Sequence, residues 1–247
     1  SMNNRRNILI ANDDGIQSPG IVRLAEAASN FGDVWVVAPE GQCSGMSQKL
    51  TIFNELNAMR RDFPSAVKGA YAISGTPADC VKVALKSLMP AAPDVVFSGI
   101  NAGYNAGYDI AYSGTIGAAM EAVLHGIPAI AFSESHDGCH EVTDKYLCAI
   151  MEELIDQPLY GEIWNVNFPG CPEAGFRGII RDVEPAPNFF FDNDYNSAEE
   201  KNGYVLTPYA RLLGPDDAPR GSDVWAVLNG YIAIGRIRNM VYRIVGL

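Results

Sequence analysis

Residues 8–15 read ILIANDDG, in which an apolar run leads directly into an asparagine, two adjacent aspartates and a glycine. The apolar run predicts a short buried strand, so Asp13 and Asp14 are expected at its carboxyl end. Ligands gather at that edge of an open parallel sheet. Adjacent carboxylates repel, and both stay ionised only where a cation or strong donors neutralise them. Residues 12–15 alone favour a solvated turn, because Asn, Asp and Gly are common turn residues, and only the rest of the chain reverses that preference.

The chain beyond this stretch alternates between helix-like and strand-like runs. Ser18 and Pro19 supply an N-cap and a first-turn proline, which predict a helix over residues 19–30. Similar signals predict helices over residues 77–89, 114–125 and 142–155, and strands over residues 34–38, 94–98, 128–132, 163–167 and 178–183. Because strands that alternate with helices form βαβ units, we predict an α/β fold, a Rossmann-like three-layer sandwich with a mostly parallel sheet.

The last part of the chain is rich in prolines, aromatic residues and turns. It predicts an extended hairpin over residues 188–213 and short antiparallel strands over residues 224–245. We therefore expect a single domain over residues 1–247, with a catalytic core in residues 1–185. Residues 186–247 would form a C-terminal antiparallel hairpin and arm that joins subunits into a homo-oligomer. The Trp and Phe residues of this arm are expected to pack rather than to stack on bases.

Composition limits the partners of this chain of 247 residues. Lys and Arg number 18 and Asp and Glu number 29, giving a net charge of −11, which argues against duplex DNA as the main partner. A small phosphorylated substrate is compatible, since a local cation or a helix terminus can meet its charge. No apolar run has the length of a membrane span, and the five cysteines form no C-x-x-C pair. We therefore expect a cytoplasmic protein that has no membrane partner.

Three loops that follow predicted parallel strands carry oxygen ligands. The first contains Asp13 and Asp14, the second contains Ser44, and the third contains Asn101 within the glycine-rich residues 99–107. Glycines allow the backbone to approach a ligand closely. Carboxylate, hydroxyl and amide oxygens suit a hard cation such as Mg²⁺ or Mn²⁺ better than zinc. Each loop alone fits an ordinary turn, whereas all three at one sheet edge predict a site.

The tetrapeptide YSGT at residues 112–115 begins the predicted helix over residues 114–125. A helix N-terminus binds anions through its free N–H groups and its dipole, and the hydroxyls of Ser113 and Thr115 can add donors. The tetrapeptide alone favours ordinary capping by Ser or Thr. A cation beside a helix N-terminus is nevertheless the arrangement that a phosphoryl group needs.

Other polar clusters give weaker indications. Residues 136–140, His-Asp-Gly-Cys-His, match no standard zinc spacing and are expected to form a surface turn. The two aspartates at residues 216–217 predict a solvated turn, and residues 220–223 fit either a loop near the substrate or the start of a strand. Ser44 lacks the G-x-S-x-G elbow of a hydrolase nucleophile.

Several motifs follow one another at characteristic spacings. They are IANDDG at residues 10–15, SPGI at 18–21, GTPADCV at 75–81, SGINAG at 98–103, YSGT at 112–115 and NVNFP at 165–169. Because these motifs occur together in this order, the chain resembles the SurE family of survival-protein nucleotidases. The resemblance is strong over about residues 7–170 and looser beyond. The resemblance implies a divalent-metal-dependent phosphatase that acts on nucleoside monophosphates, and a dimer or tetramer.

The resemblance also implies site residues by motif position. One Mg²⁺ or Mn²⁺ per subunit would be held by Asp13, Asp14, Ser44 and Asn101. The phosphate pocket would be lined by Asn12, Ser113, Gly114 and Thr115. Asp13 and Asn12 would form the catalytic set, in which either Asp13 or a water molecule is the nucleophile and Asp13 could instead be a base.

Two alternatives of other classes stay open at this stage. One is a non-catalytic nucleotide-binding module on the same sheet, and the other is a structural member that acts mainly as an oligomer. The full set of acidic, hydroxyl and amide residues counts against a scaffold, which needs none of them. The sequence shows no pocket that reads a base, and it does not distinguish 5′- from 3′-nucleotides or exclude short polyphosphate.

Overall fold

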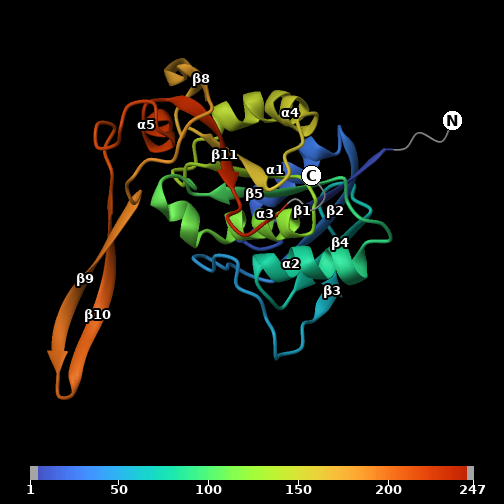
Figure 1. The fold of residues 1–247 in the computed structure, drawn as a ribbon, viewed down its shortest axis with the longest axis horizontal. Coiled ribbons are helices and arrows are strands. Elements are labelled where there is room, and N and C mark those ends of the chain that lie inside the picture. The colour runs from blue at the N-terminus through green and yellow to red at the C-terminus, as the bar shows by residue number, and fades with distance from the viewer. Residues whose placement is uncertain (1–4, 244–247) are drawn as a thin grey trace.

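The computed structural model describes residues 5–243, which form one large twisted sheet covered by helices and a hairpin that projects from it (Figure 1). The strands of the large sheet are β1 (Arg6–Ala11), β2 (Gly32–Pro39), β3 (Ala58–Arg60), β4 (Gly69–Ile73), β5 (Val95–Ala102), β6 (Ala129–Glu134), β7 (Glu162–Phe168), β8 (Gly178–Arg181) and β11 (Tyr231–Arg238). Their order is β3-β4-β2-β1-β5-β6-β7-β11-β8. Only the β3–β4 and β7–β11 pairs of this described sheet are antiparallel, which confirms the predicted α/β fold with a mostly parallel sheet.

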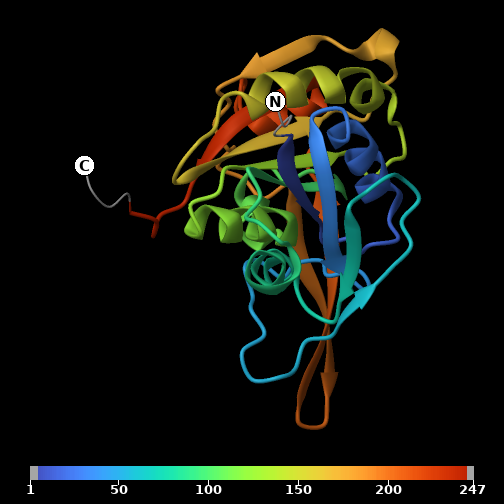
Figure 2. The same ribbon diagram turned by 90° about the vertical axis from the view of Figure 1, so that its right-hand side faces the viewer.

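Helices cover both faces of the sheet. Helices α1 (Pro19–Ala28) and α4 (Glu141–Ile155) pack on one face, and α2 (Pro77–Val83) and α3 (Gly114–Leu124) pack on the other (Figures 1 and 2). Successive strand residues point to opposite faces, so Ile8 and Ile10 enter the first core whereas Leu9 enters the second. The result is the expected three-layer sandwich.

Two features of the α2 region differ from the sequence prediction. The helix expected over residues 77–89 ends at Val83 and continues as a π-helical turn over Ala84–Leu88. Its start is as expected, because Thr76 caps it and Asp79 completes a reciprocal capping box. Strands β3 and β4, which extend the sheet beyond β2, were not predicted.

The predicted hairpin is confirmed. Strands β9 (Phe191–Glu200) and β10 (Gly203–Leu212) pair antiparallel in a separate sheet that extends away from the body (Figure 1). The hairpin base rests on a third apolar cluster, in which Tyr104 and Phe190 meet edge to face with ring centroids 5.5 Å apart.

The prediction of short antiparallel strands over residues 224–245 was wrong for its first part. Ser222 accepts a hydrogen bond from Trp225 N and caps a helix, α5 (Asp223–Leu228). Strand β11 then inserts between β7 and β8 and completes the large sheet. Both elements belong to the core rather than to an arm, because β11 is hydrogen-bonded on both sides. Residues 244 and 245 lie outside the described part of the chain.

Candidate active site

A cleft of about 770 Å³ opens at the carboxyl edge of the sheet, where the loops after β1, β2 and β5 meet the N-terminus of α3 and the hairpin base. Among the predicted site residues, its walls include Asp13, Asp14, Ser44, Asn101 and Ser113. None of the helices in residues 5–243 is long and apolar enough to cross a bilayer. The predicted site residues that the cleft brings together are up to 100 positions apart in the sequence.

Asp13 and Asp14 form the acidic floor of the cleft. Asp13 is only 5% exposed, and its Oδ1 has no hydrogen-bond partner among the described residues. Burial, reinforced by the charge of Asp14, raises the pKa of Asp13 from 3.8 to about 7, although the hydroxyl and amide of Thr115 act in the opposite direction. Burial also raises the pKa of Asp14, against hydrogen bonds from Ala102 and Gln42. Two carboxylates under this strain need a positive charge to ionise together.

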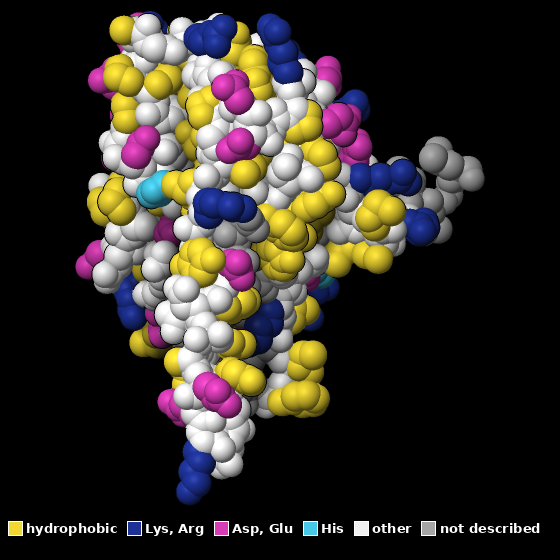
Figure 3. All heavy atoms as spheres, turned by 90° about the vertical axis from the view of Figure 1, so that its left-hand side faces the viewer, with side chains coloured by type: hydrophobic (Ala, Val, Ile, Leu, Met, Phe, Trp, Pro, Cys, Tyr) yellow, Lys and Arg dark blue, Asp and Glu magenta, His cyan; other side chains and the backbone are white. Residues whose placement is uncertain are grey.

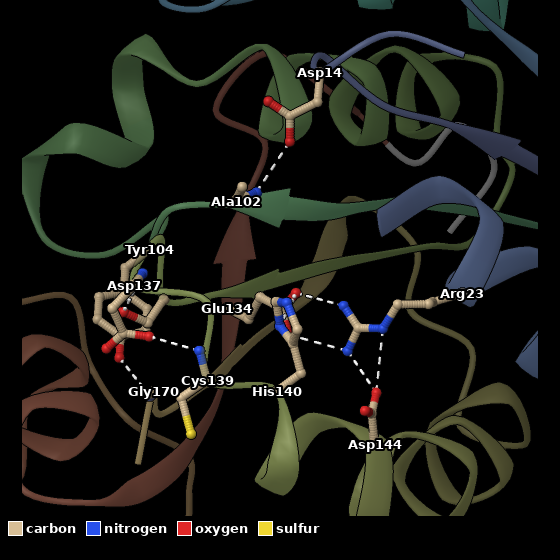
Figure 4. A network of polar contacts seen from close by, with 11 residues as sticks. Asp14, Arg23, Ala102, Tyr104, Glu134, Asp137, Cys139, His140, Asp144 and Gly170 are labelled. Atoms are coloured by element: carbon tan, nitrogen blue, oxygen red, sulfur yellow. Dashed lines mark hydrogen bonds and ion pairs between the residues drawn. The ribbon is translucent and has the colours of Figure 1, made fainter. Parts of the chain in front are cut away.

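The third loop approaches this acidic pair directly. The backbone N–H of Ala102 donates to Oδ2 of Asp14 at 3.0 Å (Figure 4), and the neighbouring Asn101 lines the same cleft. The pairing of β5 with β6 shifts register between Ser98 and Asn101, and such an irregularity re-aims the side chains that follow it. The Asn101 amide donates to Gly103 O at 2.8 Å, which fixes the orientation of the side chain.

The N-terminus of α3 lies against Asp13. Ser113 caps the helix by accepting a hydrogen bond from Ile116 N at 3.1 Å, and its side chain lines the cleft. A Cβ atom added at Gly114 would lie 3.1 Å from Cβ of Asp13 and 3.1 Å from Cγ of Pro77. Glycine at this position therefore lets the positive end of the helix approach the acidic pair.

The second loop is tied to the same helix end. Cys43 N donates to Asp13 O at 2.7 Å, and Ser47 N donates to Tyr112 O at 3.0 Å. The hydroxyl of Ser47 also bonds to Ala111 O at 2.9 Å. Ser44 lies between these anchors with an exposed side chain on the wall of the cleft. The structure thus brings Asp13, Asp14, Ser44 and Asn101 to one cleft, as the sequence predicts.

Three of the four predicted phosphate-pocket residues, Asn12, Gly114 and Thr115, do not line the cleft. Asn12 is fully buried, its amide donates to Gly15 O and to Ser18 Oγ, and its Oδ1 accepts from Gly15 N. Thr115 is also fully buried, behind Asp13. Asn12 therefore shapes the turn that carries the aspartates, because its polar atoms are committed to that turn, and Thr115 contacts the cleft only through Asp13.

Buried polar networks hold the third loop from below. Asn105 receives a hydrogen bond from Asn165 and exchanges two with Asn167, at 2.9 to 3.0 Å, and its amide reaches Ser133 Oγ at 2.7 Å. Gly103 N donates to Glu134 O, at the end of β6. These contacts make the loop part of the rigid sheet edge rather than a free surface loop.

Glu134 itself is held by residues from both helices of one face. Arg23 of α1 bridges the Glu134 and Asp144 carboxylates at 2.5 and 2.6 Å, and His140 Nδ1 lies 3.0 Å from Glu134 Oε1 (Figure 4). His140 thus packs against a structural cluster of charged side chains. No group of three or more His, Cys, Asp or Glu side chains suited to a metal occurs in the described residues, consistent with the turn expected at residues 136–140.

Asp223 resolves the ambiguity of residues 220–223. It is 2% exposed and accepts hydrogen bonds from Gly107 N at 3.0 Å and from Ala186 N at 2.8 Å. It therefore joins the third loop to the hairpin base. At residues 216–217, Asp217 accepts from Gly214 N within a turn, as expected.

Sequence reasoning missed one wall of the cleft. Asp109, Phe189, Phe191 and Tyr195 line it from the short helix after the third loop and from the hairpin. A signal existed in the sequence, since aromatic residues recur over residues 189–195, but that run also fits a packed arm. Only the folded chain shows that it reaches back to the sheet edge.

The sequence of the chain also matches a known protein family. The family described as survival protein SurE matches residues 8–182 of the chain. This chain belongs to the SurE family. Among its relatives, 5′-nucleotidase SurE of Clostridium botulinum strain Loch Maree is 36% identical over 233 residues, covering 92% of this chain and 91% of the relative. The same protein of strain Kyoto is 37% identical over equal coverage.

The solved structures agree with this family membership. The crystal structure of SurE protein from Aquifex aeolicus superposes with a TM-score of 0.81 at 33% identity, covering 96% of this chain and 94% of that one. The SurE match ends at residue 182, before the hairpin. All of the predicted SurE site residues lie within the matched segment, whereas Phe189, Phe191 and Tyr195 lie beyond it.

Proposed function

We propose that the cleft hydrolyses nucleoside monophosphates to nucleoside and inorganic phosphate with the help of one divalent cation. The chain is a metal-dependent nucleotidase of the SurE family, like the 5′-nucleotidases that it resembles over nearly its whole length. The observation that carries the proposal is the buried, unpartnered Asp13 Oδ1 beside Asp14 and the α3 N-terminus.

The residues of the cleft fit a hard cation. Asp13 and Asp14 offer carboxylate oxygens, Ser44 a hydroxyl and Asn101 an amide oxygen, which suit Mg²⁺ or Mn²⁺. The unpartnered oxygen of Asp13 and the raised pKa values of both aspartates indicate a missing positive charge. When bound, the cation neutralises the aspartates, polarises the phosphoryl group and makes water more acidic.

The remaining groups of the cleft bind and orient the phosphoryl group. The Ser113 side chain lines the cleft at the N-terminus of α3, where the positive end of the helix would stabilise oxygens that gain charge in the transition state. Asn12 and Thr115 are positioning residues in this proposal, because they act on the aspartates rather than on the phosphate. Asp13 would either accept a proton from water or attack phosphorus itself.

A direct assay tests the proposed function. The purified chain is incubated with AMP or GMP in the presence of Mn²⁺, and released inorganic phosphate is measured with and without EDTA. We expect release that depends on Mn²⁺ and stops with EDTA. Binding of the nucleotide without release would instead identify a non-catalytic module.

We extend this proposal to the identity of the metal, the oligomeric state and the cellular location. We infer Mg²⁺ or Mn²⁺ from the oxygen donors, and a cytoplasmic enzyme from the free cysteines. We also infer a homodimer or homotetramer held through the hairpin, because large apolar side chains are exposed on it. Figure 3 shows hydrophobic side chains on the projecting hairpin.

A further inference from the structure

Exposed aromatic rings stand beside the phosphate end of the cleft. Tyr112 and Phe189 lie within 22° of parallel, with ring centroids 6.3 Å apart, and both line the cleft. They are 55% and 42% exposed, respectively, although large aromatic side chains usually find burial. Tyr112 directly precedes Ser113, the cap of α3, so the rings begin one residue away from the anion-binding helix end.

The rings are held in place rather than loosely exposed. Tyr108 meets Phe189 edge to face, with centroids 5.2 Å apart, and its backbone N–H donates to Asn188 O at 2.8 Å. On the other side of Phe189, Phe191 N donates to Asp109 Oδ2 at 2.8 Å. These anchors fix the backbone on both sides of Phe189. A pre-positioned ring loses little freedom when a ligand covers it.

The chemistry of the cleft favours a flat, neutral partner at this end. None of the described residues that line it is Lys, Arg or His, so no side-chain cation is available there for a second or third phosphate. The polar groups nearest the rings are already engaged, since Asp109 accepts from Phe191 N and Gln42 bonds to Asp14. The rings therefore offer apolar and aromatic contact to the part of a substrate that lies beyond the phosphoryl group.

We propose that Tyr112 and Phe189, extended by Tyr195 of the hairpin, form a nucleobase subsite that binds the face of the base by stacking. The inference rests on the proposed function and deepens it. Every base has a π-face, so a stacking platform accepts purines and pyrimidines alike. The subsite favours aromatic nucleoside monophosphates over sugar phosphates, and it does not select one base by its edge.

The test compares each substrate with and without its base. The kcat/KM ratio of AMP to ribose 5-phosphate, and of UMP to ribose 5-phosphate, is measured for the wild type and for Phe189→Leu. Because stacking on one ring changes binding by about tenfold or more, we expect both ratios to fall about tenfold in Phe189→Leu. Phe189→Tyr should restore them. Tyr160→Leu is the matched control, since Tyr160 is 56% exposed but lies outside the cleft.

A metal-independent measurement separates this inference from the proposed function. Binding of adenosine to EDTA-treated protein is followed by ligand-observed NMR, with Tyr112→Leu as a second variant. We expect wild-type binding and its loss in both leucine variants. Equal loss of activity on AMP and ribose 5-phosphate, or unchanged ratios, would overturn the stacking subsite. A loss confined to one base would also overturn it, because that result indicates edge recognition. Absent phosphatase activity with retained adenosine binding would refute the enzyme but not the subsite.

Discussion

Asp13 combines burial, an adjacent like charge and an oxygen without a hydrogen-bond partner among the described residues, and each of these is unfavourable for an ionised carboxylate. The chain retains the group although its raised pKa shows the energetic strain. Such strain is typical of a site that is completed by a ligand. The residues around Asp13, including Gly114 and Thr115, are packed to hold it there.

The substitution Asp13→Asn tests this assignment. Asparagine has the same shape without the charge, so we expect a folded protein whose Mn²⁺-dependent phosphatase activity falls by at least about 10²–10³. Mn²⁺ affinity, measured by isothermal titration calorimetry, should fall as well. Asp216→Asn is the matched control, because Asp216 is exposed and lies outside the cleft. Near wild-type turnover of Asp13→Asn with the metal present would refute the role of Asp13.

The pH dependence of stability gives a second test at this scale. Burial first, and then Asp14, raise the pKa of Asp13 from 3.8 to about 7, so the folded state binds a proton that the unfolded state has released between those pH values. The metal-free protein should therefore lose stability as pH rises from about 4 to 7. We expect the melting temperature of EDTA-treated protein to fall over this range, and to fall less in Asp13→Asn. Equal slopes in the two proteins would contradict the shift.

Sequence and structure agree best for residues whose role is local. Asp13 and Asp14 follow β1, Ser44 lies in the loop after β2 and Asn101 lies at the end of β5, so their place at the sheet edge could be predicted. The sequence predicts Asn12 in the phosphate pocket and in the catalytic set, and only the folded turn shows that its amide is bonded to Gly15 and Ser18.

Among the secondary-structure elements, helix α3 packs directly against the backbone of the second loop at Gly117, where there is no room for a side chain. A Cβ atom at Gly117 would lie 1.9 Å from Ser47 O, a backbone atom that cannot rotate away. Alanine favours a helix interior by about 1 kcal/mol over glycine, but here it would push the loop from the helix. The loop that carries Ser44 can therefore lie this close to α3 only because residue 117 is glycine and has no Cβ atom.

The substitution Gly117→Ala tests the importance of this contact. We expect weaker Mn²⁺ binding and about tenfold lower phosphatase activity, because Ser44 moves away from Asp13 and Asn101. Gly41→Ala is the matched control in the same loop, since a Cβ atom there meets nothing within 4 Å. Titration of both variants with Mn²⁺ checks the expectation. Gly117→Ala with wild-type affinity would show that the loop does not set the site.

Elements with a strong local pattern were predicted, and those defined by tertiary contacts were not. The helices over α1, α3 and α4 and the central strands were expected within a few residues. Strand β3 has only three residues, too few for a period, and β4 (GAYAI) owes its strand state to pairing with β2. Helix α5 was read as strand because its short apolar run fits both states.

Across the whole molecule, the hairpin is the least self-sufficient part. An isolated two-stranded hairpin is marginally stable in water, yet this one extends from the body with exposed Tyr204, Leu206 and Leu212. Its base also reaches the cleft through Tyr195 and Phe191. Assembly and catalysis are therefore expected to be linked through this element.

Leu206→Glu tests the proposed assembly. Light scattering after size-exclusion chromatography should give a dimer or tetramer for the wild type, and a smaller species for Leu206→Glu, because a buried charge disfavours an apolar interface. Lys201→Glu, in the tight turn at the hairpin tip, is the charge control. A monomeric wild type, or an unchanged assembly of Leu206→Glu, would argue against the hairpin as the interface.

The proposed active site depends on one ion that is bound by residues of all three loops beside the N-terminus of α3. A crystal soaked in Mn²⁺ and measured for anomalous scattering locates that ion directly. We predict one peak per subunit in contact with oxygens of Asp13, Asp14, Ser44 and Asn101, at about 2.1 Å, the distance usual for small hard cations. A peak elsewhere, or none at a Mn²⁺ concentration that supports phosphate release, would contradict it.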